Sequence, residues 1–336
     1  MPSNAAEMDR LRSAFDESLR AYLAERRAEL PEASDLLDEI DRALAAGGKR
    51  LRPAFCYWGF VAAGGEPDAR IVRAAASLEL LHTFALVHDD VMDNADERRG
   101  EPTVHAKRGA NVAILVGDMA LVLADDAFMG SGFDEKDLHR SFGVYSRMRR
   151  QVIAGQYLDL EAANNDIDES TARRIAVLKS GSYSIEQPLL MGACLAGASA
   201  DVLQDLSGFG RPLGEAFQLR DDVLGTFGEA RVTGKPIDSD IREGKRHVLY
   251  TKGLAALEGE ERAFFASRWG GGGSLSEAEI TRLRDLLESS GARRATEELV
   301  AKLLAEAESA LENASFEASA RLALQDLADL ATKRSA

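Results

Sequence analysis

Long stretches of the chain repeat apolar residues every three or four positions, and this spacing predicts a mostly helical protein. Residues 69–91 are apolar on almost every side, which is typical of a helix at the centre of a bundle. Polar residues 94–103 then interrupt the pattern. We expect further helices over 13–45, from about residue 53, and over 110–128, 136–163, 169–196, 200–223 and 250–267.

Glycine-rich segments separate these helices. The pair at 47–48 ends the first helical stretch, because glycine is common directly after a helix. A charged, glycine-rich loop is expected over 225–246, and a run of glycines marks a flexible break just before Ser276. Ser276 and Glu279 have the spacing of a capping box, so another helix begins there. We interpret that break as a linker inside one domain spanning 1–336.

Composition supports one helical class and limits the partners. Aromatic residues are only 6% of the chain and prolines number 8, and this composition disfavours β-strands. A hydrophobic share of 45% is ample for a buried core. The net charge of −15 arises from 41 basic and 56 acidic residues. A nucleic-acid partner is therefore not expected, because phosphate backbones attract basic surfaces. Any anionic substrate must be bound by local positive charge.

Features of secretion and membrane insertion are missing from the pattern. Cys56 and Cys194 form neither a disulfide framework nor a metal-binding spacing, which favours a cytoplasmic protein. The first residues contain no apolar stretch of the kind found in signal peptides. The best candidate for a membrane span, 110–124, is short and carries Asp118, so we interpret it as a buried helix and expect no membrane span.

Two acidic clusters offer the most specific chemistry, and they lie far apart in the chain. Each follows an apolar helical stretch: Asp89, Asp90 and Asp93 end the first, and Asp221 and Asp222 end the second. Positions four apart share a helix face, so the first and last aspartates of the first cluster can bind a cation together, while the middle one points partly aside. Oxygen ligands alone favour a hard cation such as Mg²⁺.

An acidic cluster can also be a solvated helix end that pairs with nearby arginines. The recurrence of the cluster, together with separate basic sites, favours metal binding instead. Each basic site stands beside a glycine, a helix end or an acidic cluster: Lys49 with Arg52, Arg98 with Arg99, Lys179, Lys235 and Lys245. Together they indicate two bound anionic groups, one bridged by metal and one held directly by Lys and Arg.

Sequence motifs along nearly the whole chain identify a family that fits this chemistry. They are GGKRLRP at 47–53, LLHTFALVHDDVMDNADERRG at 80–100, GQYLDL at 155–160, LKSGSYS at 178–184, FQLRDDVLGTFG at 217–228 and TGKPIDSDIREGK at 233–245. In this order they resemble the short-chain trans-polyprenyl diphosphate synthases, which include farnesyl and geranylgeranyl diphosphate synthases. The resemblance implies a type I isoprenoid synthase helical bundle with a central substrate cavity, and a homodimer.

The resemblance also implies a reaction, the head-to-tail condensation of isopentenyl diphosphate with an allylic diphosphate by ionisation, condensation and elimination. The first substrate's diphosphate would be bound by Lys49, Arg52, His82 and Arg99. The allylic diphosphate would be bound by Arg98, Lys179, Lys235 and Lys245. Three Mg²⁺ ions would be bound by Asp89, Asp93 and Asp221, with Asp90 and Asp222 beside them. Gln218 and the Lys179–Ser180 segment would face the carbocation, and Asp159 would support the metal-bound waters.

One position departs from the family pattern. Gly225 stands where the motif Asp-Asp-x-x-Asp carries its last aspartate, so Asp221 lacks a carboxylate one turn further on. Asp222, or Asp238 or Asp240 from the following loop, could compensate.

The product of this family is limited by bulk beneath the first acidic cluster. Phe84 and Ala85 are the fifth and fourth residues before Asp89, and a large residue followed by a small one resembles the geranylgeranyl pattern. The alternative is that Phe84 is simply core and that the floor lies near Met119. Farnesyl and longer products remain open.

Three other classes compete with this interpretation. His88-Asp89 is compatible with a metal-dependent phosphohydrolase, but that class needs more histidine ligands than a chain with 5 His readily supplies. A catalytically silent partner subunit would keep the fold and lose ligands, yet the first cluster and the basic sites are intact. A terpene cyclase typically lacks the GGKRLRP site. The pathway and the preferred allylic primer do not follow from the sequence.

Overall fold

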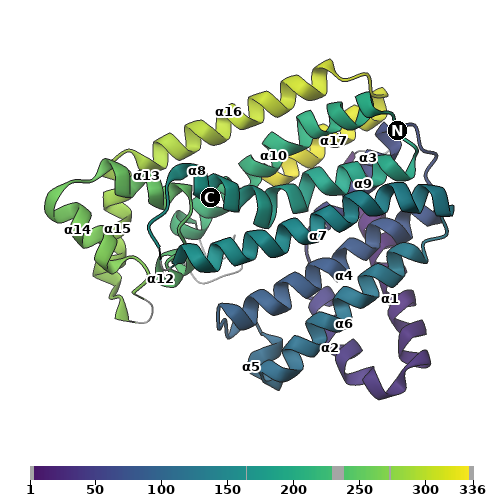
Figure 1. Ribbon diagram of the computed structural model, residues 1–336, viewed down its shortest axis with the longest axis horizontal. Helices are drawn as coiled ribbons and strands as arrows, with labels where there is room; N and C mark the ends of the chain where they lie inside the picture. The colour runs from purple at the N-terminus through teal and green to yellow at the C-terminus, as the bar shows by residue number, and fades with distance from the viewer. Residues whose placement is uncertain (1–3, 164, 229–237, 272–273, 333–336) are drawn as a thin grey trace. The chain divides into compact units, whose positions relative to one another are not determined.

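The computed structural model describes residues 4–163, 165–228, 238–271 and 274–332, and most of them lie in helices (Figure 1). The prediction of an all-α protein is confirmed. The chain divides into two compact units. The first comprises Met1–Tyr145, Pro188–Gln204 and Ser315–Leu327; the second comprises Ser146–Gln187, Asp205–Ala314 and Ala328–Ala336. A single domain over 1–336 and a central substrate cavity stay predictions.

Helices make up nearly all of both units. Those of the first unit are α1 (Asn4–Glu29), the 3₁₀ turn η1 (Pro31–Ala33), α2 (Ser34–Ala45), α3 (Leu51–Ala62), α4 (Ala69–Met92), α5 (Val104–Arg108) and α6 (Ala110–Met129). Those of the second are α8 (Glu169–Ala176), the π-helix η2 (Val177–Glu186), α12 (Ser239–Glu243), α13 (Val248–Ala256), α14 (Gly259–Arg268), α15 (Glu277–Ser289) and α16 (Ala292–Asn313). Helices with residues in both units are α7 (Glu135–Ala163), α9 (Gln187–Leu195), α10 (Ala200–Phe227) and α17 (Ala318–Thr332).

Helix α4 is the centre of the first unit, as its apolar sequence predicts. Residues 74–81 are all buried, so the helix is covered on every side. It packs against α1, α2, α3 and α6, and Figure 1 shows α6 running alongside it. Within the described residues, α4 is the one helix long and apolar enough to cross a membrane, and 67% of its apolar window is buried in the protein, as in the core helix of a soluble protein.

A short hairpin follows α4 and accounts for the polar stretch over 94–103. Strands β1 (Glu97–Arg98) and β2 (Glu101–Pro102) pair antiparallel and leave Arg99 and Gly100 as a two-residue turn. Both turn residues have positive φ, 56° and 78°, which is the conformation of a type I′ hairpin. The turn fixes the direction of the arginine pair relative to α4.

Several helix limits differ from the sequence prediction. The stretch over 13–45 breaks at η1, because Pro31 cannot donate a backbone hydrogen bond to a continuing helix. The helix expected over 169–196 is split by the π-helix η2, and the one over 250–267 ends at Ala256 and restarts at Gly259. The loop expected over 225–246 begins later, since α10 continues to Phe227, and α12 lies within it.

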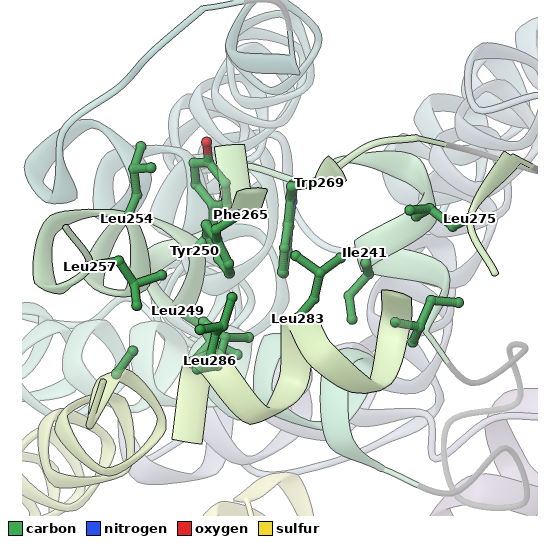
Figure 2. Packing of buried hydrophobic residues seen from close by; sticks show 13 residues of the cluster. Ile241, Leu249, Tyr250, Leu254, Leu257, Phe265, Trp269, Leu275, Leu283 and Leu286 are labelled. Carbon is green, nitrogen blue, oxygen red and sulfur yellow. The ribbon is translucent and has the colours of Figure 1, made fainter. Parts of the chain in front are cut away.

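Aromatic packing fixes the segment around α12 in the second unit. Figure 2 shows Tyr250, Phe265 and Trp269 close together, with ring centroids 5.2 to 5.4 Å apart. Ile241 of α12 is fully buried in the same cluster. The Trp269 indole donates to the Lys245 carbonyl at 3.1 Å. The expected capping box of Ser276 and Glu279, which begins α15, is confirmed.

Candidate active site

The first acidic cluster lies at the C-terminal end of α4. Asp89 and Asp93 are one helical turn apart and partly exposed. Asp90 is 5% exposed and its Oδ1 accepts a hydrogen bond from Nε of Arg98 in β1 at 2.8 Å; Nη2 of Arg98 forms an ion pair with the same oxygen at 2.6 Å. The same guanidinium lies 3.6 Å from Asp89. Asp90 therefore anchors the hairpin to α4, and the other two aspartates share a face that solvent can reach.

Arg98 carries its positive charge next to the acidic cluster. Burial acts to lower the pKa of Arg98, but Asp90, Asp89 and Asp93 outweigh it and raise the pKa above the ordinary value. Arg98 is thus a permanent cation. Asp89 and Asp93 are the partly exposed carboxylates of the cluster, so they are the two that a divalent cation could reach from solvent.

A basic cluster made of Lys49, Arg52, His82 and Arg99 lies on the same side of the first unit. His82 is two helical turns before Asp89, so both occupy one face of α4. Burial and then the positive charges of Arg52 and Arg99 hold the pKa of His82 well below its ordinary value. Burial and neighbouring arginines also lower the pKa of Arg99. An anion bound here would relieve this repulsion between like charges.

The loop that carries Lys49 reaches the hairpin through glycines. Gly47 and Gly48 have φ of 85° and 149°, which favour glycine. Nη1 of Arg99 donates to the Gly47 carbonyl. The guanidinium nitrogens of Arg99 lie 3.6 Å from where a Gly48 Cβ would stand. The arginine pair therefore divides its contacts, Arg98 to the acidic cluster and Arg99 to the basic loop.

Arg50 holds this loop from inside the unit. It caps the start of α3 with φ of 51° and donates to Glu79 at 2.7 Å, to Asp16 at 2.8 Å and to the Leu44 carbonyl at 2.7 Å. The Arg50 and Glu79 side chains are only 6% and 5% exposed. This pair was not predicted from the sequence, because the basic residues of the GGKRLRP motif were interpreted as substrate ligands. The pair positions Lys49 and Arg52, its neighbours in the chain.

The proposed floor lies where α4 packs against α6. Phe84 is 8% exposed and its ring meets His88 edge-on at 4.9 Å, while Ala85 is partly exposed. Nε2 of His88 lies 3.1 Å from the Ile114 carbonyl, and the ring occupies the space that a Gly117 Cβ would enter, at 2.2 Å. His88 is thus a packing residue between the two helices, which speaks against its use as a metal ligand.

The second unit contributes a separate group around Asp159 of α7. Lys179 of the π-helix η2 donates to Asp159 at 2.6 Å, and the Lys245 ammonium lies 3.6 Å from the same carboxylate. A Cβ on Gly155 would lie 2.4 Å from the Lys179 backbone nitrogen, so the glycine allows α7 and η2 to approach. The structure therefore joins three residues that the sequence only named one by one.

The second acidic cluster lies at the end of α10. Asp222 is buried and accepts from Gln218 at 2.7 Å, while its Oδ2 has no hydrogen-bond partner among the residues that the structure describes. Burial and then the charge of Asp240 raise the pKa of Asp222 well above its ordinary value; Asp221 and Asp159 add to this, and only the Gln218 hydrogen bond opposes it. Asp221 is partly exposed. The outer aspartate is therefore the better placed of the pair to meet a metal.

The remaining predicted residues fall in different places. Ser180 is partly exposed in η2 beside Lys179. Asp238 accepts from Arg242 at 2.9 Å, whereas Asp240 lies against Gly225. Lys235 lies outside the described residues. The two acidic clusters belong to different units, so their meeting around one diphosphate stays a prediction.

The residues present fit Mg²⁺ by their chemistry. Asp89, Asp93 and Asp221 offer only oxygen, and within the described part of the chain the buried Oδ2 of Asp222 is an acceptor without a hydrogen-bond donor. The described residues bring no three His, Cys, Asp or Glu side chains into a preformed metal cage. Magnesium usually takes one or two carboxylates and completes its shell with water and substrate phosphate.

Comparison with known proteins gives a consistent result. A model of the family described as polyprenyl synthetase matches residues 34–286. Geranylgeranyl diphosphate synthase of Saccharolobus solfataricus is 37% identical over 228 residues, which are 67% of this chain and 68% of that protein. Geranylfarnesyl diphosphate synthase of Aeropyrum pernix is 35% identical over 254 residues, 74% of this chain and 78% of that one.

The fold agrees as well. A crystal structure of geranylgeranyl pyrophosphate synthase from Corynebacterium glutamicum, complexed with isoprenyl diphosphate and magnesium, matches with a TM-score of 0.92 at 32% identity. The match covers 98% of this chain and 99% of that one. The expected isoprenoid synthase helical fold is confirmed.

Proposed function

Since this chain belongs to the polyprenyl synthetase family and is a prenyltransferase, we propose that it joins isopentenyl diphosphate head to tail to an allylic diphosphate, with geranylgeranyl diphosphate as main product. The observation that carries the proposal is the hairpin after α4. Arg98 contacts the acidic cluster and the next residue, Arg99, contacts the loop of the basic cluster. One tight turn thus links a site for a metal-bound diphosphate to a site for a directly bound one.

The basic cluster would bind the diphosphate of isopentenyl diphosphate. Lys49, Arg52 and Arg99 supply positive charge, and His82 with its lowered pKa is neutral and donates an N–H. A neutral donor suits this position, because a further cation would add to the repulsion that already lowers the pKa of Arg99.

The allylic diphosphate would be bound by Arg98, Lys179 and Lys245, together with Lys235. Asp159 contacts both the Lys179 and Lys245 ammonium groups, and this pairing would keep them in position to stabilise the leaving group. Asp89, Asp93 and Asp221 would hold Mg²⁺, which would supply further positive charge beside the departing diphosphate; we propose three ions. The solved relative with magnesium and isoprenyl diphosphate supports a divalent metal.

The carbon chemistry follows from the charges that the chain can offer. The oxygen atoms of the Gln218 amide and the Ser180 hydroxyl would point toward the allylic carbocation and stabilise its positive charge. The alkene of isopentenyl diphosphate attacks this cation, and a carbon–carbon bond forms. The product cation then loses a proton. We propose that the released diphosphate, which the reaction itself produces, is the base that accepts it.

The length of the product would be set beneath Asp89. Phe84 is held by His88 and is nearly buried, so it can block a growing chain, whereas Ala85 leaves room beside it. Relatives of similar identity include geranylgeranyl, geranylfarnesyl and farnesyl diphosphate synthases, so the proposed twenty-carbon product rests on Phe84 and Ala85. Farnesyl and longer products are the alternatives.

A homodimer through α6 is part of the proposal. Leu115, Val122 and Met129 are 54%, 56% and 49% exposed and recur every seventh residue, so they form one apolar stripe on that helix. Such a stripe costs solubility unless it is covered, and a two-fold axis lets a second copy cover it with the same face. Leu115→Glu/Val122→Glu should convert the dimer to a monomer in light scattering.

An elongation assay tests the function. Labelled isopentenyl diphosphate and farnesyl diphosphate are incubated with the purified chain and Mg²⁺, with Asp89→Asn as the test variant. Asp96→Asn is the matched control, because Asp96 is exposed in the adjoining segment. We expect wild type and control to elongate and the test variant to lose at least about a hundredfold in rate. Phosphate release without elongation in the wild type would support the phosphohydrolase alternative instead.

A further inference from the structure

The place of the missing carboxylate is defined by helix α10. The helix continues through Gly225 to Phe227, so Gly225 lies one turn after Asp221 on the same face. A side chain at 225 would therefore point toward the same region as Asp221. Glycine leaves that space open in the backbone of α10.

Another carboxylate occupies the space. A Cβ built on Gly225 would lie 2.1 Å from Oδ2, 2.7 Å from Cγ and 3.2 Å from Oδ1 of Asp240. Real Cβ atoms do not approach so closely, so a side chain at 225 and the present Asp240 position exclude each other. Asp240 reaches the site from α12, a different segment of the chain.

The position of Asp240 is fixed by its surroundings. Its backbone carbonyl accepts from the Lys245 N–H at 3.0 Å, and Ile241, the next residue, is fully buried in the aromatic cluster. The buried His247 accepts the Tyr250 N–H through Nδ1, so its Nε2 carries the proton, 3.9 Å from Oδ2 of Asp240.

Asp238, the other candidate, is engaged elsewhere. It begins α12 with φ of 72° and accepts from Arg242 at 2.9 Å in a pair one turn apart. The carboxylate of Asp240, by contrast, lies against Gly225, one turn after Asp221 on α10. The geometry therefore separates two aspartates that the sequence left equivalent.

We propose, on the basis of the proposed function, that Asp240 replaces the last aspartate of the second motif and binds Mg²⁺ together with Asp221. Gly225 and Asp240 then form one unit: the glycine makes room, and the aspartate of α12 supplies the carboxylate. The chain thus keeps the donor set of the motif while taking one donor from another segment.

Four variants test this pairing: Asp240→Asn, Asp238→Asn, Gly225→Asp and Gly225→Asp/Asp240→Ala. Asp285→Asn is the surface control, because Asp285 is exposed on α15. The first readout needs no turnover: the rise in Tm on adding Mg²⁺ with inorganic pyrophosphate. The second is the Mg²⁺ concentration that gives half-maximal elongation.

We expect Asp240→Asn to keep the metal-free Tm and to need about tenfold more Mg²⁺ for both readouts. Asp238→Asn should respond to Mg²⁺ as the wild type does. Gly225→Asp alone should lower the metal-free Tm, because two carboxylates compete for one space. The double variant should regain the Tm and most of the Mg²⁺ response by placing the carboxylate on α10.

The inference is wrong if Asp240→Asn responds to Mg²⁺ within about twofold of the control, or if the double variant is no better than Gly225→Asp. A failure of the proposed function is recognised separately, since the wild type would then not elongate at all. The thermal readout with Mg²⁺ and pyrophosphate still decides the role of Asp240 in that case.

Discussion

The buried pair of Arg50 and Glu79 gives the sharpest test of how this fold supports its site. Arg50→Met removes the guanidinium and leaves the Glu79 carboxylate inside the first unit, where its side chain is 5% exposed. The variant also strips hydrogen bonds from Asp16 and from the Leu44 carbonyl. Methionine keeps most of the apolar contact of the arginine stem, so the lost charge dominates the effect.

The magnitude follows from the burial of the pair. Removing one partner of a buried ion pair costs about 3–5 kcal/mol, because the other charge stays behind without compensation. Asp16 is 32% exposed in its side chain, so water recovers much of its loss and it adds at most about 1 kcal/mol. We therefore expect the free energy of unfolding to fall by about 3–5 kcal/mol.

The assay is urea unfolding followed by circular dichroism, with Arg50→Met/Glu79→Met as the second variant. Removing both charges should return at least about 2 kcal/mol of the loss, because no carboxylate is then left unpaired. In steady-state kinetics, Arg50→Met should raise KM for isopentenyl diphosphate more than KM for the allylic substrate, since the loop of Lys49 loses its anchor. A single variant that loses less than about 1 kcal/mol, or a double variant as unstable as the single one, would refute the reasoning.

Three further predictions concern product length, pH and packing. Phe84→Ala should shift the main alcohol to longer chains in product chromatography, and an unchanged product would place the floor elsewhere. Burial lowers the pKa of His247 to about 4 in the folded protein. Between pH 6.5 and pH 4 only the unfolded chain takes up a proton at this residue, so the free energy of unfolding falls as the pH drops through that range. The wild type should lose about 2 kcal/mol of its free energy of unfolding between pH 7 and pH 5 through His247, and His247→Asn should not show this loss. An equal loss in the wild type and the variant would contradict the role of His247. A Cβ on Gly181 would lie 2.6 Å from the Gly214 carbonyl oxygen, so Gly181→Ala should lower stability by about 1–3 kcal/mol and slow turnover. Gly143→Ala, with open space around it, is the control and should not destabilise; equal effects of the two alanines would count against the packing argument.

The helices were predictable from the sequence because apolar periodicity reports a local property. Residues 69–91 gave α4 almost to the residue, and 110–128 gave α6. The breaks were harder: Pro31 and Gly259 are each a single signal inside a stretch whose periodicity continues past them. The π-helix η2 was not predictable from local periodicity, and in the structure its Gly181 lies close to Gly214 of α10.

The site was predictable in its parts and less so in its arrangement. Motif positions identified Asp89, Lys179 and the other ligand candidates one at a time. That Arg98 and Arg99 turn to different clusters depends on the hairpin, and that Asp240 takes the place beside Gly225 depends on the fold of a distant segment. Contacts of this kind are set by tertiary structure, which no local pattern records.

Product sizing tests the central claim most directly. The purified chain is incubated with isopentenyl diphosphate, Mg²⁺ and, separately, dimethylallyl, geranyl and farnesyl diphosphates, and the dephosphorylated alcohols are sized by chromatography. We predict a dominant twenty-carbon alcohol from all three primers and none in the presence of EDTA. No alcohol longer than the primer, with EDTA-sensitive release of phosphate instead, would contradict the account.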